Sequence, residues 1–169
     1  MADLDKARTN PAEQFWDELE RVQAGLLGLT DMRDHLQPMA PQPDRRTNSI
    51  WFFTRTSSDL FKQVGAGAKA MFCLVGRDHD YHACVMGQLR ENRMDAKIDE
   101  YWSPVVAAWY DGRNDPEMTL LEMQLENGKI WASTGNSLVF GWEIAKANLT
   151  DGEPDVGVVK TVVFHRGGR

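Results

Sequence analysis

The residues best suited to chemistry lie between positions 49 and 62, where an aromatic run is followed by hydroxyl side chains. Residues 51–53, Trp-Phe-Phe, are strong strand formers and supply rigid apolar area. Thr54, Ser57 and Ser58 place hydroxyl groups where this strand is expected to end. Such an edge suits a flat cofactor with an anionic tail.

A short helix is expected from about Ser58 to Val64, because Gly65 follows and glycine commonly ends a helix. The exposed amides of its first turn make a plausible seat for a phosphate group. Lys62 lies one turn beyond Ser58 on the same face, so its ammonium is within reach of that phosphate. Arg45 and Arg46 precede the aromatic run in a proline-containing loop. They are interpreted either as phosphate ligands or, more plainly, as a solvated pair.

Two further groups of reactive side chains are explained without a functional role. Cys73 and Cys84 would lie opposite each other if residues 77–80 turn a symmetric hairpin; reduced core cysteines are the plainer alternative to a redox switch. His79, Asp80 and His82 resemble a metal site, but no further ligand follows at a suitable spacing. The sequence therefore predicts a hairpin tip there and no bound metal.

Composition narrows the function classes. The chain has 169 residues, 42% of them hydrophobic, and a formal net charge of −6. The length fits one domain, and the acidic balance argues against a nucleic-acid or anionic-membrane surface. The polar N-terminus and the absence of a long apolar run predict a cytoplasmic protein. Neither a phosphate-binding glycine loop nor a nucleophile elbow is present, so no catalytic residue can be named.

The elements that must position these residues follow from capping and periodicity. Asn10 and Pro11 mark the start of a helix, and Asn127-Gly128 is the strongest hairpin signal in the chain. The other expected elements are strands at 25–30, 69–76, 81–90, 119–125, 129–133 and 158–164, a turn at 31–34, and helices that begin at Asn92, Ser103 and Ser137, the last running through Leu138–Asn148.

An ordered set of motifs then resembles one family. The first motifs along the chain are Leu36-x-Pro38-Met39, a loop, residues 51–54 and residues 57–59. Residues 97–104, 108–110, 115–116 and 130–131 follow in matching order. The set resembles the flavin-binding split-barrel family of pyridoxamine phosphate oxidases, specifically its general stress protein branch.

The resemblance implies a mainly β fold with peripheral helices: an antiparallel FMN-binding split barrel of six or seven strands. It divides the single domain into a flexible segment 1–9, a family core 10–149 and an extra strand with tail at 150–169. It implies a homodimer with a flavin, FMN or FAD, between subunits and a nicotinamide as a candidate reductant. The implied cofactor-binding residues are Gln37, Pro38, Met39, Phe53, Thr54, Ser57, Ser58, Lys62, His82 and Trp131.

Three functions remain open at this point. The first is a flavin-binding general stress protein with or without flavin-dependent oxidoreductase activity. The second is a dimeric ligand-binding or stress-response module that has lost flavin, because His35 and Gln37 stand where family members commonly carry arginines. The third is a true pyridoxamine phosphate oxidase. Those oxidases carry a C-terminal motif, which His165-Arg166 resembles only weakly.

Overall fold

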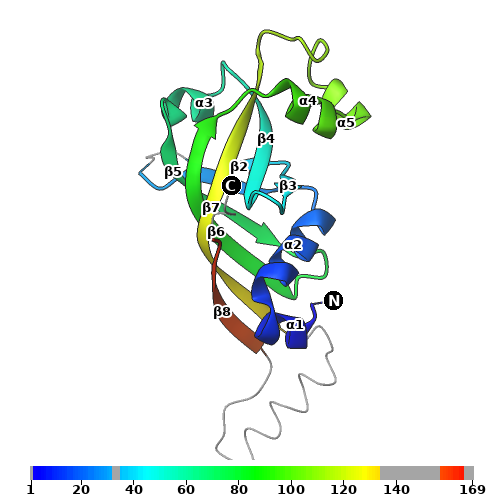
Figure 1. The fold of residues 1–169 in the computed structure, drawn as a ribbon, viewed down its shortest axis with the longest axis vertical. Helices are drawn as coiled ribbons and strands as arrows, with labels where there is room; N and C mark the ends of the chain where they lie inside the picture. Colours follow the sequence, from blue (N-terminus) through cyan, green and yellow to red (C-terminus); the bar gives the residue numbers. More distant parts are fainter. Residues whose placement is uncertain (1, 32–34, 134–156, 166–169) are drawn as a thin grey trace, which may run out of the picture.

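The structure, a computed structural model, describes residues 2–31, 35–133 and 157–165. In these residues one antiparallel sheet carries the fold (Figure 1). Seven strands follow one another in the order β2-β1-β5-β6-β7-β4-β3, and β8 pairs with β7 beside this path. The strands are β1 (Gly25–Leu29), β2 (Gln37–Met39), β3 (Gln42–Asp44), β4 (Ser49–Arg55), β5 (Ala68–Val75), β6 (Tyr81–Glu91), β7 (Met118–Ser133) and β8 (Gly157–Val163).

The two ends of this strand order are joined by one bent segment. β2 pairs with β1 and β3 pairs with β4, yet only Ala40 and Pro41 separate β2 from β3. The chain therefore crosses from one edge of the sheet to the other within eight residues, 37–44, and closes the curled sheet into a barrel. This arrangement confirms the predicted antiparallel barrel with peripheral helices.

β7 differs most from the sequence prediction. The predicted hairpin at Asn127-Gly128 is wrong, because both residues lie inside one 16-residue strand. Asn127 pairs with Met86 on one side and with Val163 on the other. The glycine is required by a close approach: a Cβ at Gly128 would lie 2.7 Å from Cγ1 of Val85. Glycine thus serves strand packing here and not a turn.

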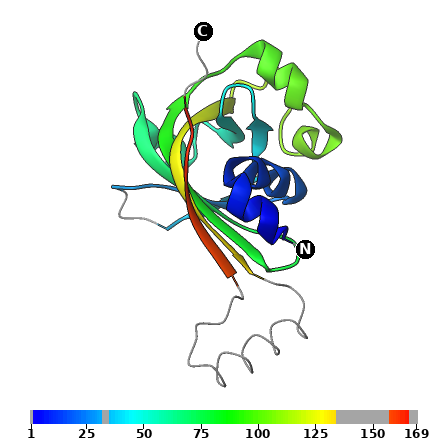
Figure 2. The ribbon, with the colours of Figure 1, turned by 60° about the horizontal axis from the view of Figure 1, so that its bottom comes forward.

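The inner face of the sheet packs against two N-terminal helices, α1 (Leu4–Thr9) and α2 (Pro11–Arg21), around which it curves in Figure 2. The predicted start of α2 is confirmed, because the Asn10 side chain accepts a hydrogen bond from the Glu13 amide at 3.3 Å. Residues 4–9, expected to be flexible, instead form a helix. Its Ala7 is fully buried, and the Ala2 amide donates to Asp80 at 2.6 Å, so packing orders this segment.

Three short helices surround the opposite end of the sheet: α3 (Asp59–Val64), α4 (Asp95–Tyr101) and α5 (Pro104–Ala107). Ser58 caps α3 and Ser103 caps α5 as predicted. The prediction that Asn92 caps the next helix is wrong. Its side chain donates to the buried carboxylate of Glu122 at 2.8 Å, and α4 begins after Met94 without a side-chain cap.

Part of the sequence prediction falls outside the described residues. This holds for the turn at 32–34, the helix at 138–148 and the tail at 166–169. The predicted strand near the C-terminus is present as β8, which continues along the edge of β7 that β4 leaves free. No helix among the described residues is long and apolar enough to span a membrane.

Candidate functional site

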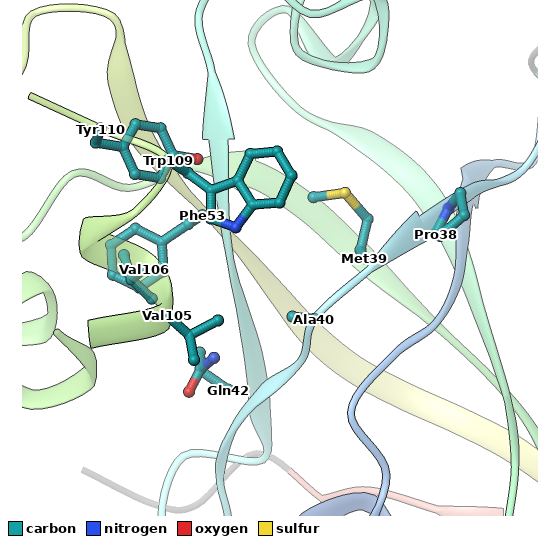
Figure 3. Close-up of a pocket in the computed structure, with 9 residues that line it drawn as sticks. All are labelled: Pro38, Met39, Ala40, Gln42, Phe53, Val105, Val106, Trp109 and Tyr110. Carbon is teal, nitrogen blue, oxygen red and sulfur yellow. The ribbon is translucent and has the colours of Figure 1, made fainter. Parts of the chain in front are cut away.

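A cleft of about 300 Å³ opens where the bent β2–β3 segment passes β4 and α5 (Figure 3). Its walls come from three separate parts of the chain, which only the fold brings together. Most of the lining is apolar or aromatic, as is usual for a small-molecule site. The lining residues are Pro38, Met39, Ala40, Gln42, Phe53, Val105, Val106, Trp109 and Tyr110.

Phe53 supplies the floor of the cleft, and its orientation is fixed by other aromatic rings. Its ring centroid lies 6.3 Å from that of Trp102 in an edge-on arrangement and 6.2 Å from that of Tyr110. Arg55 then stacks over the Tyr110 ring at 5.4 Å. Such packing fixes the ring positions before any ligand arrives, which lowers the cost of binding.

The rim of the cleft carries exposed apolar side chains. Val105 is 73% exposed and Trp109 is 68% exposed, whereas Val106 between them is buried. The backbone of this segment is held in place, because Arg55 donates to the Trp109 carbonyl at 2.5 Å and Ser103 caps α5. Figure 3 shows the Trp109 ring between Phe53 and Met39. An exposed indole above an aromatic floor suits a planar ligand.

A buried ion pair connects two of the elements beside the cleft, α4 and β3. Lys97 of α4 donates to Asp44 of β3 at 2.8 Å, and Glu100 lies at the same distance. Burial, the largest single influence, would raise the pKa of Asp44, but the hydrogen bonds from Lys97 and Thr47 together with the charges of Lys97 and Arg46 outweigh it, and the pKa is lowered. The Lys97 ammonium also lies over the Trp51 ring at 5.7 Å. The pair therefore ties α4 to β3, the strand that begins with the cleft residue Gln42.

The structure brings three of the predicted cofactor residues together in the cleft: Pro38, Met39 and Phe53. Gln37 lies beside them in β2, where it pairs with Leu27, and does not line the cleft.

The predicted hydroxyl cluster lies at the end of β4, behind the floor. Thr54 is buried and its Oγ1 lies 3.1 Å from the Ser58 hydroxyl, which accepts from the Phe61 amide. Because neighbouring residues of a strand face opposite sides, Thr54 and the cleft residue Phe53 point apart. Ser57 and Lys62 are exposed.

Lys62 is held by the acidic residue of its own helix turn. Its ammonium lies 3.6 Å from the Asp59 carboxylate. A phosphate seated at the start of α3 would compete with that carboxylate for the ammonium.

His82 and Trp131 face each other on β6 and β7, and neither of them lines the cleft. Leu120 pairs with Phe53, and Trp131 lies eleven positions further along β7. At a strand rise of about 3.3 Å per residue, roughly 35 Å of strand lies between the cleft floor and Trp131.

Arg45 is not the solvated residue of the simpler sequence interpretation, because carboxylates hold its side chain. Its guanidinium binds three carboxylates of α2, those of Glu13, Asp17 and Glu20, at 2.7 to 2.8 Å. Arginine offers five donors in a planar fork, which explains how one side chain satisfies three partners. The interaction fastens the loop before β4 to the helix that covers the core.

Sequence reasoning did not identify the second wall of the cleft. Trp109 and Tyr110 belong to the family motif at 108–110 but were not named as cofactor residues, and neither were Val105, Val106, Ala40 and Gln42. The signal that could have found this wall is the pair of family motifs at 97–104 and 108–110, which flank the helix start at Ser103-Pro104. No group of three potential metal ligands occurs in the part of the chain that the structure describes.

Comparison with known proteins gives a consistent result. The family model described as "Pyridoxamine 5'-phosphate oxidase like" matches residues 10–155. General stress protein 26 from Jannaschia sp. CCS1 is 38% identical, with a TM-score of 0.78 over 92% of this chain and 99% of that one. The general stress FMN/FAD binding protein from Xanthomonas citri is 35% identical, with a TM-score of 0.66 over 71% and 87%.

A third structure supports the fold alone. The pyridoxamine 5'-phosphate oxidase-related, FMN binding protein from Nostoc punctiforme is 12% identical, with a TM-score of 0.63 over 93% of this chain and 97% of that one. The search of curated proteins gave no match. Since the family model spans most of the sequence, the chain belongs to the pyridoxamine 5'-phosphate oxidase-like family of split-barrel proteins and resembles its general stress proteins.

Proposed function

We propose that this protein is a flavin-binding general stress protein that holds FMN, or FAD, with the ring system in the cleft between β2–β3, β4 and α5. The observation that carries the proposal is the aromatic and apolar lining around Phe53 and Trp109. A tricyclic flavin ring presents two flat apolar faces, which fit between an indole and a phenyl ring. The Xanthomonas citri relative, described as an FMN/FAD binding protein, supports this choice.

Different residues of the chain would bind different parts of the flavin. The Phe53 floor and the Met39 thioether offer contact area, and the neighbouring Gln37 amide can hydrogen-bond the polar edge of the ring. The anionic tail would then pass around the end of β4 toward the predicted hydroxyls of Thr54, Ser57 and Ser58, with Lys62 as the nearby cation. Bound flavin would supply two-electron redox chemistry, and the protein would orient the ring and limit water around it.

An oxidoreductase activity with a nicotinamide reductant is part of this proposal. The rim residues Val105 and Trp109 leave one side of the cleft open to solvent, so a second planar molecule has a route to the site. In such a reaction the protein contributes access and orientation more than acid or base groups. None of the residues lining the cleft carries a formal charge.

We also propose a homodimer, in which Trp131 of one copy reaches the cleft of the other. Trp131 does not line the cleft of its own chain, and it lies eleven positions along β7 from Leu120, the register partner of Phe53. Exposed apolar residues at the rim and near Trp131, such as Val159, provide surface that a second copy can bury. Sedimentation equilibrium tests the dimer: a purely monomeric protein at micromolar concentration would contradict it.

The flavin proposal is tested by titrating the purified protein with FMN and FAD and following tryptophan fluorescence. Saturable quenching is expected, because Trp109 lies in the cleft. Val105→Asp should weaken binding by about tenfold, or 1.4 kcal/mol, because it places a charge beside the anionic flavin without removing a buried group. Met94→Asp is the matched control, since Met94 is exposed but does not line the cleft. Equal affinities for both variants and the parent would refute the cleft assignment.

A second candidate function is a ligand-binding module without flavin. His35 and Gln37, at positions where the family commonly carries arginines, favour it, because the uncharged Gln37 brings no attraction for a phosphate. The same titration separates the two functions. A colourless protein that responds to neither FMN nor FAD would favour this module, and screening planar aromatic ligands against the cleft would be the next measurement.

A further inference from the structure

Cys73 and Cys84 form a cross-strand pair on the outer face of the sheet. They are direct register partners on β5 and β6, so both side chains leave the sheet on the same side. Directly opposed residues in antiparallel strands have Cα atoms about 4.5 to 5.5 Å apart. A disulfide needs a Cα separation of about 4.4 to 6.8 Å. The backbone is therefore already in place for an S–S bond, although both thiols are free here.

The two thiols have different chemical characters. A hydrogen bond from Cys84 lowers the pKa of Cys73 to about 7, below the usual range of a cysteine thiol. The same hydrogen bond raises the pKa of Cys84. Cys73 is therefore the better nucleophile at neutral pH, and Cys84 retains a proton that it can give up later.

Cys73 is also reachable by a small oxidant. It lines an open cleft of about 230 Å³ together with Leu26, Pro38 and Val75. Leu26, its register partner on β1, and Val75, two residues along β5, are both exposed. Both cysteines are half-buried, which shields them from bulky reagents but leaves room for a molecule the size of water.

We propose that Cys73 and Cys84 are a thiol-based redox site that hydroperoxides convert reversibly into an intrachain disulfide. The Cys73 thiolate attacks one oxygen of hydrogen peroxide and the O–O bond breaks. The departing hydroxide takes up a proton to form water and leaves a sulfenic acid on Cys73. The Cys84 sulfur then attacks the Cys73 sulfur, the S–O bond breaks, and a second water leaves with the Cys84 proton. Two thiols are oxidised and one peroxide is reduced to two waters.

The disulfide would join the central strands β5 and β6 without involving the flavin cleft, so the inference does not depend on the proposed function. The two clefts share only one residue, Pro38. A small thiol such as dithiothreitol would reopen the bond by exchange, because a disulfide on an accessible sheet face is exposed to attack.

The test treats the native, full-length protein with one equivalent of hydrogen peroxide and determines thiols, intact mass and the cross-linked peptides. We expect loss of both thiols, a mass lower by two hydrogen atoms, a Cys73–Cys84 cross-link and full recovery with dithiothreitol. Cys84→Ser should stop at a sulfenic acid on Cys73 that dimedone traps, and Cys73→Ser should react more slowly than the parent.

Three outcomes would overturn the proposal. Two unreactive thiols would mean that the sheet face is covered, for instance by a second copy of the chain. Addition of oxygen to one cysteine while the other thiol persists would mean that the pair does not close. A cross-link between two chains on a non-reducing gel would mean that the partner of each cysteine lies in another molecule. The parent protein alone decides among these, so the result does not depend on how the variants fold.

Discussion

Replacing Lys97 with methionine should destabilise the protein by about 3 kcal/mol, because it leaves the Asp44 carboxylate buried without its main cation. The Asp44 side chain is 3% exposed and that of Lys97 is 11% exposed, so water replaces little of the lost interaction. Breaking a buried pair from one side typically costs about 3–5 kcal/mol. The lower end applies here, because Arg46 still lies 3.6 Å from Asp44 and its backbone amide donates to the same carboxylate.

The sign of the pH dependence follows from the lowered pKa of Asp44. In the parent protein this carboxylate contributes stability above its unfolded pKa, and the contribution is lost as the pH falls through the lower folded value. In Lys97→Met the burial of Asp44 is offset only by Arg46 and the neighbouring hydrogen-bond donors, so its folded pKa should rise above the unfolded value. Acid then protonates Asp44 and removes the buried charge that destabilises the variant. The difference in unfolding free energy between variant and parent should therefore shrink from pH 7.5 toward pH 4.5.

Urea unfolding at both pH values measures the gap, and Asp44→Asn with Lys97→Met completes a double-mutant cycle. The double variant should be less destabilised than the sum of the two single changes, because it buries no lone charge. A loss below about 1 kcal/mol in Lys97→Met, or a gap that widens in acid, would refute the assignment of a buried, mutually dependent pair.

Three further changes test other parts of the structure. Gly87→Ala should cost roughly 1–3 kcal/mol or more, because its Cβ would lie 2.1 Å from the Gln124 carbonyl oxygen; a melting temperature equal to that of the parent would contradict the close approach of β6 and β7. Met94→Asp should increase the free energy of unfolding by about 1 kcal/mol, because α4 has no side-chain cap and aspartate can supply one. Unchanged thermal unfolding would mean that other groups already bind the amides at the helix start. Arg45→Met should lose about 1 kcal/mol in low salt and less in high salt, because its three carboxylate partners are partly exposed; unfolding curves that ignore salt would refute this.

The sequence correctly predicted helix starts at which the capping hydrogen bonds join residues close together in the chain. The Asn10-Pro11 start of α2 and the serine caps of α3 and α5 were correct because a cap involves only residues within the next turn. Asn92 shows where such reasoning ends. It has the right residue type for a cap, but Glu122 of β7, thirty positions away, is a stronger partner for its amide.

The Asn-Gly error has the same cause. The dipeptide favours a tight turn locally, but Gly128 lies where β6 approaches too closely for any side chain. A strand flanked on both sides gains ladder hydrogen bonds that a hairpin would give up. Periodicity could not show that β6 and β8 both pair with this segment, because their residues come from positions 81–91 and 157–163.

Three of the predicted cofactor residues line one wall of a cleft, whereas the residues of its second wall were not among those predicted. Residues 38, 39 and 53 were identified because their motifs are compact in sequence, whereas residues 105–110 join them only through the packing of α4 and α5 on β4. No sequence rule connects two such distant segments without knowledge of the fold.

Strand alternation also restricts how one ligand could use the predicted site. Phe53 and Thr54 are neighbours in β4 and face opposite sides, so a flat ring lying on Phe53 cannot touch the Thr54 hydroxyl from the same side. The strand ends at Arg55, one residue later, so a flexible tail has a short path around its end to Thr54 and Ser58. A ligand made of a rigid ring and a flexible anionic chain satisfies this geometry, whereas a compact anion or a rigid planar molecule alone could use only one of the two faces.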